Sequence, residues 1–379
     1  MIFKKIFIFT VVIVLTILIN EKEQLNRYNY KHDFDGVSLV NNSNLVKCTL
    51  QTCFNLKNCE DNFKIYIYDQ PKAILSDIFQ KILNVLKSLG NDYLTKDPKK
   101  ACLYISSFDT IDRDRLDIIY VKNLEKLIKN WNETNHLIFN LYSGTWPSYL
   151  EELDFNASRA ILAKASVSTN FYRENFDISF PLFSSNYIPE QIISYIPNYP
   201  NKTIELNSKK YLLTFKGKRY LNGISSEIRS SIRQLNNGQD ILILTTCKHG
   251  SRWQELKDDK CDSENDLYDK YDYDELFHNS TFCLVPRGRR LGTYRFLEAL
   301  KIGCIPVILS NGWVLPFSEV LDWSKAVIWG DEQNVQMIPT IIRQISSQQI
   351  AEMKYYCIFF FNEYFSTIEK ITKTTIEVI

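Results

Sequence analysis

The chain has 379 residues, 45% of them hydrophobic, which is enough to bury one large core or two domains. Its formal net charge of +1 gives no overall field that would attract nucleic acid or an acidic surface. Nine cysteines are unusual but tolerable in a cytosolic enzyme, whereas in the secretory pathway they indicate disulfides and one remaining thiol.

The N-terminus predicts a membrane anchor. Residues 1–5 form a short positive tail, and residues 6–19 carry no charge. This run is short for a membrane span and suits a signal-peptide core, but no small-x-small cleavage site follows it. We therefore expect an uncleaved anchor at 6–19, with Lys4 and Lys5 holding the tail in the cytosol and the body in the lumen. A short span also fits the thinner membranes of the early secretory pathway.

Two further features bear on the lumenal prediction. The polar residues 20–60 show no clear hydrophobic period and are interpreted as a stem. Asn-x-Ser/Thr sequons give weak support to a lumenal chain, and the candidate for glycosylation is Asn279. The sequons lie at Asn41, Asn132, Asn156, Asn201 and Asn279.

Residues 61–205 are predicted to form a first α/β domain, because apolar runs of strand length alternate with helical patterns. Residues 160–166 carry helix-forming side chains, and the proline-rich stretch 181–208 marks the domain boundary. The other expected elements, in chain order, are strand 63–68, helix 74–89, strand 101–105, helix 124–130 and strand 136–141.

Residues 206–379 are predicted to form a second α/β domain. One or two helices over residues 348–379 are expected to close the chain. The other expected elements, in chain order, are strand 211–215, helix 227–235, strand 240–245, strand 282–285, a helix after Thr293, strand 305–309 and strand 327–329.

A βαβ unit lies at the centre of this second domain. A polar loop with Arg287, Arg289 and Arg290 follows strand 282–285 and precedes the helix. Thr293 is the expected N-cap of that helix, and Gly303 is expected to end it. Because loops at the carboxyl ends of parallel strands bind ligands, three arginines aimed at a helix N-terminus predict an anion site, most simply for phosphate.

Two further groups are expected at the same edge of the sheet. Arg295 and Glu298 share one face of the new helix, where one can meet phosphate and the other can accept bonds from ribose hydroxyls. Lys216 and Lys218 end strand 211–215, and Gly217 between them permits close backbone approach. The alternatives are a solvent-facing Arg–Glu pair and a basic hairpin tip.

Several other chemistries find no motif in this sequence. The Walker and G-x-G-x-x-G patterns and the nucleophile elbow G-x-S-x-G do not occur, and the four histidines show no paired spacing for zinc. Asp112 with Asp114, and Asp272 with Asp274, have the Asp-x-Asp form that holds manganese in other transferases. Such doublets are common, and we expect no metal site.

The motifs resemble the exostosin family over residues 48–379, and within it the members that act as the glucuronosyltransferase of the heparan sulfate polymerase. The stretches that carry this resemblance are 139–146, 162–166, 215–220, 245–250, 282–292, 295–300 and 309–319. It implies two Rossmann-like domains facing a cleft, the GT-B arrangement of nucleotide-sugar transferases.

The resemblance implies the activity: transfer of glucuronic acid from UDP-glucuronic acid to the 4-hydroxyl of a terminal N-acetylglucosamine, with inversion and without a cofactor. Arg289 matches an arginine that binds the donor carboxylate or shapes the loop, and these roles stay open. Tyr149 and Leu116 are weaker candidates on the acceptor side. Nucleotide contacts are implied for Lys216, Lys218, Tyr220, Arg229, His249, Tyr273, Arg295 and Glu298.

An inverting transfer needs a general base, expected from the first domain. Asp114, just past strand 101–105, is the candidate, with a helix cap or a solvated loop carboxylate as the alternative. The resemblance implies a Golgi and endoplasmic reticulum type II membrane protein, a second exostosin subunit as partner, and heparan sulfate backbone as acceptor. It also leads us to expect that this chain lacks a second, N-acetylglucosaminyl catalytic domain. The alternative function is a non-catalytic scaffold in the polymerase.

The cysteines predict disulfides near the site. Strands on either side of a βαβ helix lie side by side or one apart, so Cys283 and Cys304 can bridge. Two buried free thiols are the alternative. The pairing that exostosin similarity implies leaves Cys357 free and joins Cys48 to Cys53, Cys59 to Cys102, Cys247 to Cys261 and Cys283 to Cys304.

Overall fold

The computed structural model describes residues 48–59, 63–69, 76–107, 134–141, 157, 159–183, 209–220, 226–250 and 253–379. They fall within one compact unit, Val46–Ile379. No helix among these residues is long and apolar enough to cross a membrane. The predicted anchor at 6–19, most of the stem and the predicted helix at 124–130 lie outside the described residues.

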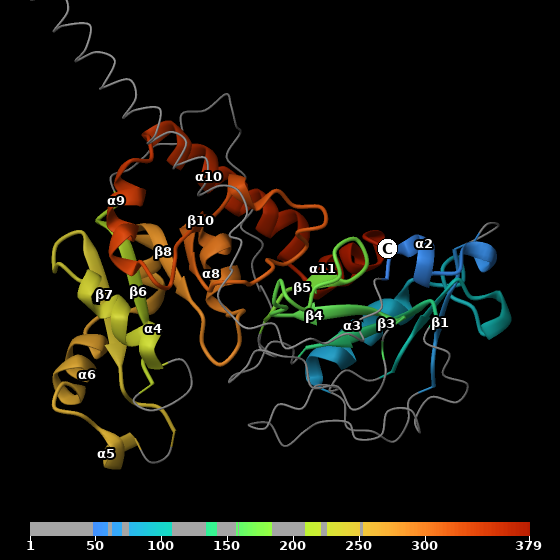
Figure 1. Cartoon of the computed structure of the whole chain (residues 1–379), viewed down its shortest axis with the longest axis horizontal. Coiled ribbons are helices and arrows are strands. Elements are labelled where there is room, and N and C mark those ends of the chain that lie inside the picture. The colour runs from blue at the N-terminus through green and yellow to red at the C-terminus, as the bar shows by residue number, and fades with distance from the viewer. Residues whose placement is uncertain are drawn as a thin grey trace, which may run out of the picture. The chain divides into compact units, whose positions relative to one another are not determined.

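The first sheet has five parallel strands that follow one another in chain order (Figure 1). Helix α3 (Asp77–Ser88) begins at Ser76, whose hydroxyl accepts a hydrogen bond from the Phe79 amide, and it buries Phe79, Ile82, Leu83 and Leu86. The strands are β1 (Ile65–Ile67), β2 (Leu103–Ile105), β3 (His136–Asn140), β4 (Ile161–Ala165) and β5 (Ile178–Phe180).

Strand β4 corrects the helical expectation for residues 160–166. All five of its residues are buried, so the alternation that marks a half-exposed strand is absent. Alanine, leucine and lysine favour a helix locally, but here tertiary burial decides the conformation. The buried Lys164 ammonium is tolerated because Asp177 lies 3.1 Å away and the Phe171 carbonyl accepts its hydrogen bond at 2.6 Å.

The second sheet also has five parallel strands, in the order β10-β9-β8-β6-β7. The strand order reverses at β6, which pairs with β7 on one side and β8 on the other. Ligands of open α/β sheets bind at the carboxyl ends of the strands beside such a reversal. The strands are β6 (Tyr211–Lys218), β7 (Ile241–Thr246), β8 (Ser280–Pro286), β9 (Ile305–Leu309) and β10 (Ile328–Trp329).

The βαβ unit is confirmed, with one correction. Helix α8 (Arg295–Ile302) runs between β8 and the neighbouring parallel strand β9, and Gly303 ends it with a left-handed φ of 68°. Thr293 is not the N-cap, because the helix begins one residue later, at Tyr294, which makes no capping bond. The Thr293 hydroxyl instead accepts from the Arg295 amide at 3.4 Å.

The remaining helices lie mainly in the C-terminal half. Helix α10 (Ser347–Phe360) passes through a π-helical turn, Phe361–Phe365, into α11 (Ile368–Glu377), which packs against α3 of the first sheet (Figure 1). The helices are α2 (Leu50–Cys53), α4 (Ser226–Ser231), α5 (Trp253–Leu256), α6 (Cys261–Asp269), α7 (Tyr273–His278), α9 (Ile338–Arg343), α10 (Ser347–Phe360) and α11 (Ile368–Glu377).

The segments that follow β4 and β9 join the two sheets. Ser168 and Trp313 form an isolated antiparallel bridge, and the Val314 amide donates to the Val167 carbonyl at 3.0 Å. The Glu319 carboxylate accepts from the Tyr172 hydroxyl and the Ser179 amide, both at 2.6 Å. These bonds hold the carboxyl edge of the first sheet against the segment after β9.

All four implied disulfides are present, and Cys357 is a buried free thiol. The bridge between Cys283 on β8 and Cys304 before β9 spans a Cα–Cα distance of 5.7 Å. Cys247 and Cys261 join the end of β7 to the start of α6. Two of the four disulfides therefore stabilise the sheet that carries the arginine loop, which is defined here as residues 287–293.

Candidate functional site

The structure brings most of the predicted nucleotide contacts to one edge of the second sheet. Because β6, β7 and β8 are parallel neighbours, their carboxyl ends meet at the switch point. Lys216, Lys218 and Tyr220 come from the end of β6, and His249 follows β7. The arginine loop follows β8 and leads into Arg295 and Glu298 on α8.

Arg295 crosses the end of β6. Its guanidinium carbon lies 4.7 Å from the centre of the Phe215 ring, and one terminal nitrogen donates to the Lys216 carbonyl at 2.9 Å. A Cβ atom at Gly217 would lie 2.7 Å from that nitrogen, so a side chain here would displace the guanidinium. The Arg295 Nε is buried and has no hydrogen-bond partner among the described residues.

Glu298 faces Tyr273, the first residue of α7. The Tyr273 hydroxyl donates to Glu298 Oε2 at 2.5 Å. Burial, and then the charge of Glu298, raise the pKa of Tyr273, while Arg295 lowers it. The phenol is therefore a stable donor, and it orients a carboxylate that still offers its second oxygen.

Arg229 on α4 joins β6 to the arginine loop. Its guanidinium donates to the Lys218 carbonyl at 2.7 Å and to the Arg287 carbonyl at 3.2 Å. A Cβ at Gly288 would lie 2.9 Å from the terminal nitrogen of Arg229, so this glycine also makes room for an arginine. The Tyr220 ring covers Arg229, with 4.9 Å between the guanidinium carbon and the ring centre.

His249 completes this side of the site. Its ring meets that of Tyr220 edge to face, with the centres 4.7 Å apart. Partial burial lowers the pKa of His249, and the cations of Lys218, Arg229 and Arg289 lower it further. Several positive charges therefore converge here, as an anion site requires.

The side chain of Lys216 is held inside the protein and does not extend into the site. Its side chain is buried, with the ammonium 4.2 Å from the centre of the Tyr268 ring and donating to the Tyr271 carbonyl. Lys218, two residues later on the same strand, is exposed. Of the two lysines, Lys218 has its ammonium where a ligand can reach it.

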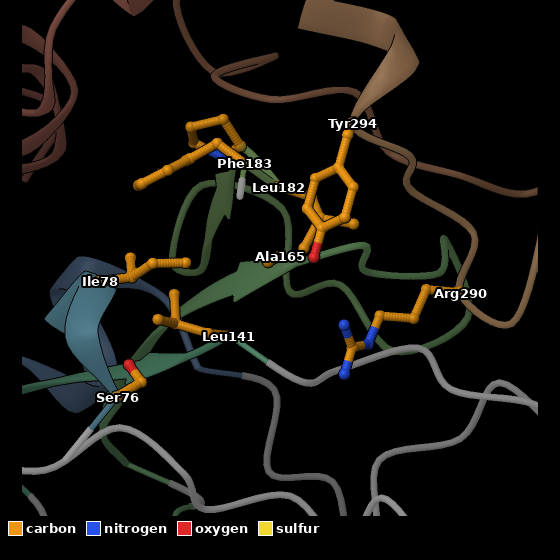
Figure 2. Close-up of a pocket in the computed structure, with 9 residues that line it drawn as sticks. Ser76, Ile78, Leu141, Ala165, Leu182, Phe183, Arg290 and Tyr294 are labelled. Atoms are coloured by element: carbon orange, nitrogen blue, oxygen red, sulfur yellow. The ribbon is translucent and has the colours of Figure 1, made fainter. Parts of the chain in front are cut away.

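The arginine loop corrects one expectation, because its three arginines diverge. Arg287 forms a salt bridge with Glu332, whose two oxygens lie 2.7 and 2.8 Å from its Nε. Arg289 lies close enough to His249 to influence its charge. Arg290 is buried and lines a hollow beside the first sheet (Figure 2). Only Arg289 stays near Lys218, Arg229 and His249, and these four residues are called the cation cluster below.

One contact of the arginine loop was not predicted from the sequence. Ser166, which follows β4, has a φ of 87°, a strained value for a residue other than glycine. A Cβ at Gly292 would lie 2.5 Å from the Ser166 hydroxyl and 3.3 Å from the Trp313 ring. The Ser166 hydroxyl and the Trp313 Nε1 are buried without hydrogen-bond partners in the described part of the chain.

The remaining candidates lie elsewhere. Asp114, Leu116 and Tyr149 lie outside the described residues. Asp272 caps α7, because its carboxylate accepts from the Glu275 amide at 2.8 Å, and no group of three potential metal ligands occurs among the described residues. Asn279 ends α7, half-buried, and its amide donates to the Glu275 carbonyl at 3.0 Å.

Comparisons with known proteins agree on one family. The exostosin GT47 domain matches residues 59–345. Over 345 residues the chain is 48% identical to Exostosin-1a of Danio rerio, an alignment that covers 88% of this chain and 46% of that relative. It is also 48% identical over 345 residues to Exostosin-1 of Mus musculus, covering 88% of this chain and 45% of that one. The chain thus spans slightly less than half the length of these relatives.

A solved glycosyltransferase from Rickettsia africae ESF-5 is similar over 84% of this chain and 98% of its own, with a TM-score of 0.37 and 9% identity, too distant to support an argument. Two parallel sheets define an α/β protein, and positive side chains gather at one edge of the second sheet. The chain belongs to the exostosin family and carries its GT47 domain.

Proposed function

We propose that this chain is an inverting glycosyltransferase. It transfers glucuronic acid from UDP-glucuronic acid to the 4-hydroxyl of a terminal N-acetylglucosamine in heparan sulfate synthesis. The observation that carries the proposal is the cation cluster at the β6/β8 switch point, next to Glu298, in a member of the exostosin family. Family membership supports a transferase, and the choice of donor rests on the motifs around the arginine loop.

The cluster suits a nucleoside diphosphate. Lys218 and Arg289 supply positive charge for the phosphates, His249 can donate a hydrogen bond, and Arg295 begins the helix that follows the loop. Glu298 supplies a carboxylate oxygen that can accept bonds from ribose hydroxyls. These fixed charges stabilise the leaving diphosphate in the transition state, so we expect a chelator to leave transfer intact.

The acceptor is proposed to bind on the side of the first sheet, as in a GT-B arrangement. Asp114 is the proposed general base, which takes the proton from the acceptor hydroxyl while the diphosphate leaves from the opposite face of the donor sugar. Tyr149 and Leu116 are proposed contacts on this side. The cluster and this base together supply what inversion needs, an anion site and a proton acceptor.

The setting of the protein is also proposed. We infer a single-pass type II protein of the Golgi and endoplasmic reticulum, anchored by residues 6–19, with a lumenal body and a second exostosin subunit as partner. Four disulfides and the sequon at Asn279 support an oxidising compartment. Immunolocalisation and glycosidase digestion of the expressed full chain test this placement.

The second candidate function is a scaffold that binds and stabilises a catalytic partner. Titration of UDP into the purified protein separates the two functions, because a transferase needs the nucleotide site and a scaffold does not. Measurable UDP affinity, together with glucuronic acid transfer to an N-acetylglucosamine-terminated acceptor, supports the transferase. No UDP binding by folded protein would favour the scaffold.

Single substitutions locate the site. Arg295→Ala and Glu298→Ala should each weaken UDP binding and transfer, since charge-assisted bonds contribute roughly 1.5–3 kcal/mol, or about ten- to a hundred-fold. Arg343→Ala is the matched control, because Arg343 pairs with Asp240 just before β7, at the amino edge of the sheet. Wild-type UDP affinity in both site variants would contradict the proposed placement.

A further inference from the structure

A hollow lies between the arginine loop and the carboxyl edge of the first sheet (Figure 2). Leu141 follows β3, Ala165 ends β4, and Leu182 follows β5, so three adjacent strands contribute to its wall. Arg290 and Tyr294 close it from the opposite side. Figure 2 shows their side chains directed towards Ala165 and Leu141.

The size of the hollow limits what it can hold. Its volume is about 50 Å³. Sites for whole small-molecule ligands span roughly 300–1,000 Å³, so neither a sugar ring nor a nucleotide fits. A single substituent of a few heavy atoms does.

The residues that line the hollow indicate which kind of substituent it can hold. The strand-end residues Leu141, Ala165 and Leu182 are apolar, and Phe183 next to them is buried, whereas Ser76, Arg290 and Tyr294 supply the polar atoms of the lining. Against the apolar strand ends an anionic group would lose its hydration, whereas a methyl group gains from burial there. The Arg290 guanidinium and the Tyr294 hydroxyl can donate to an oxygen beside that methyl group. A methyl group bonded to a carbonyl is an acetyl group, which N-acetylated sugars carry as an acetamide.

The position of the hollow assigns it to the acceptor. Arg289 belongs to the cation cluster with Lys218 and His249, whereas the next residue, Arg290, faces the first sheet. The hollow is therefore separated from the proposed nucleotide site by the loop itself, on the proposed acceptor side. This assignment rests on the proposed function, whose acceptor ends in N-acetylglucosamine. The acetyl methyl group is the one apolar substituent of that sugar.

We propose that the hollow receives the acetyl methyl group of the acceptor, with Arg290 and Tyr294 donating to the acetamide oxygen. Leu182 and Ala165 then determine specificity, because they set the depth of the hollow. The site selects acceptors that are N-acetylated.

The test compares two acceptor disaccharides that differ by one methyl group, N-acetylglucosaminyl-glucuronic acid and its N-formyl counterpart. Wild-type full chain should prefer the N-acetyl acceptor by roughly ten-fold or more in kcat/KM, the range for one buried methyl or methylene group. Leu182→Phe, which fills the hollow from a half-buried position, should bring this ratio close to one without changing UDP affinity. Leu212→Phe is the matched control, a half-buried leucine at the amino end of β6, and it should keep the preference.

A second readout keeps the hollow and the proposed function distinguishable. Saturation-transfer NMR on the same disaccharides should show the acetyl methyl as the most strongly saturated group with wild-type protein, and this signal should fall in Leu182→Phe. If wild type transfers glucuronic acid equally well to both acceptors, or if the preference survives in Leu182→Phe, the hollow does not hold the methyl group. If no transfer occurs, the proposed function fails and the methyl signal alone decides. A strong acetyl methyl signal in wild type that falls in Leu182→Phe supports the assignment of the hollow. A weak signal in wild type, or an unchanged signal in the variant, overturns it.

Discussion

Gly217 lies where the Arg295 guanidinium crosses the end of β6, between the Phe215 ring and the Lys216 carbonyl. A Cβ atom there would approach a terminal nitrogen of Arg295 to 2.7 Å and the Phe215 ring to 2.8 Å. The absence of one side chain therefore leaves room for an arginine far along the chain. The same holds for Gly288, which admits Arg229.

Gly217→Ala should consequently mimic loss of Arg295 while keeping its charge. We expect UDP affinity to fall about ten-fold or more, because a displaced guanidinium loses a charge-assisted bond. Gly238→Ala is the control, since a Cβ there meets nothing within 4 Å, although its positive φ adds local strain. Calorimetric titration measures both. An unchanged affinity in Gly217→Ala would mean that Arg295 does not contact the nucleotide.

His249 gives the site a pH dependence whose sign can be stated. Partial burial and three neighbouring cations hold its pKa below the ordinary 6.5. A bound diphosphate cancels part of that positive charge and raises the pKa, so binding takes up a proton. By linkage, UDP affinity rises as the pH falls through the interval between the two pKa values.

The corresponding measurement is UDP affinity against pH in wild type and in His249→Gln. Taking the difference of the two curves removes the protons that UDP itself takes up. We expect the wild-type curve to rise more steeply towards acidic pH. Parallel curves would show that His249 does not sense the phosphates.

Among the contacts between elements, the arginine loop lies so close to the end of β4 that a side chain at Gly292 would clash with Ser166. A Cβ atom at Gly292 would lie 2.5 Å from the Ser166 hydroxyl, and Ser166 has a φ of 87°. Gly292→Ala should lower the free energy of unfolding by about 1–3 kcal/mol, the usual effect of overpacking. It should also shift the loop and so reduce transfer.

A second substitution separates this clash from other effects. Ser166→Gly removes both the hydroxyl and the strain of a positive φ, so it should recover most of the stability that Gly292→Ala loses. Ser166→Ala keeps the Cβ atom at 3.2 Å and the strained backbone, and should recover less. Urea unfolding of the single and double variants measures the coupling. Additive losses would contradict it.

In the molecule as a whole, the half-buried Glu319 joins the two sheets. Its Oε1 accepts from Tyr172 and Ser179, and its Oε2 is buried without a hydrogen-bond partner among the described residues. Burial raises the pKa of this carboxyl above its ordinary 4.5. Between the unfolded pKa and this raised pKa, the folded protein keeps a proton on Glu319 that the unfolded chain has released. The stability that goes with the protonated carboxyl is lost as the pH rises through the raised pKa.

Glu319→Gln keeps an acceptor oxygen for both bonds and removes the charge. We expect its free energy of unfolding to lose this pH dependence and to exceed that of wild type at neutral pH. Glu363→Gln, at an exposed glutamate, is the control. Denaturant unfolding across mildly acidic and neutral pH measures the difference. A wild-type profile in Glu319→Gln would assign the pH dependence to other groups.

Much of the second domain was predictable because its signals are local. Strand 305–309 has the predicted bounds, and the βαβ unit around α8 follows from an apolar run, a loop and Gly303. The bridge between Cys283 and Cys304 follows from the neighbouring strands that such a unit requires, and family similarity implies all four pairs. The carboxyl edge shared by Lys218 and the arginine loop follows from parallel pairing alone.

Other features depend on residues far away in the chain. Strand β4 looks helical because burial on both faces removes its alternation, and strand β5 was missed because it ends directly before Pro181, where the proline-rich boundary was predicted to begin. Three arginines in one loop look equivalent, yet Arg287 meets Glu332 and Arg290 meets the first sheet. Local sequence sets backbone preference, whereas the direction of a charged side chain is set by partners brought near only by folding. The family motifs, the βαβ unit and the sheet edge shared by Lys218 and the arginine loop could therefore be predicted from local sequence, whereas only tertiary contacts separated Arg289 from Arg287 and Arg290 and formed the hollow.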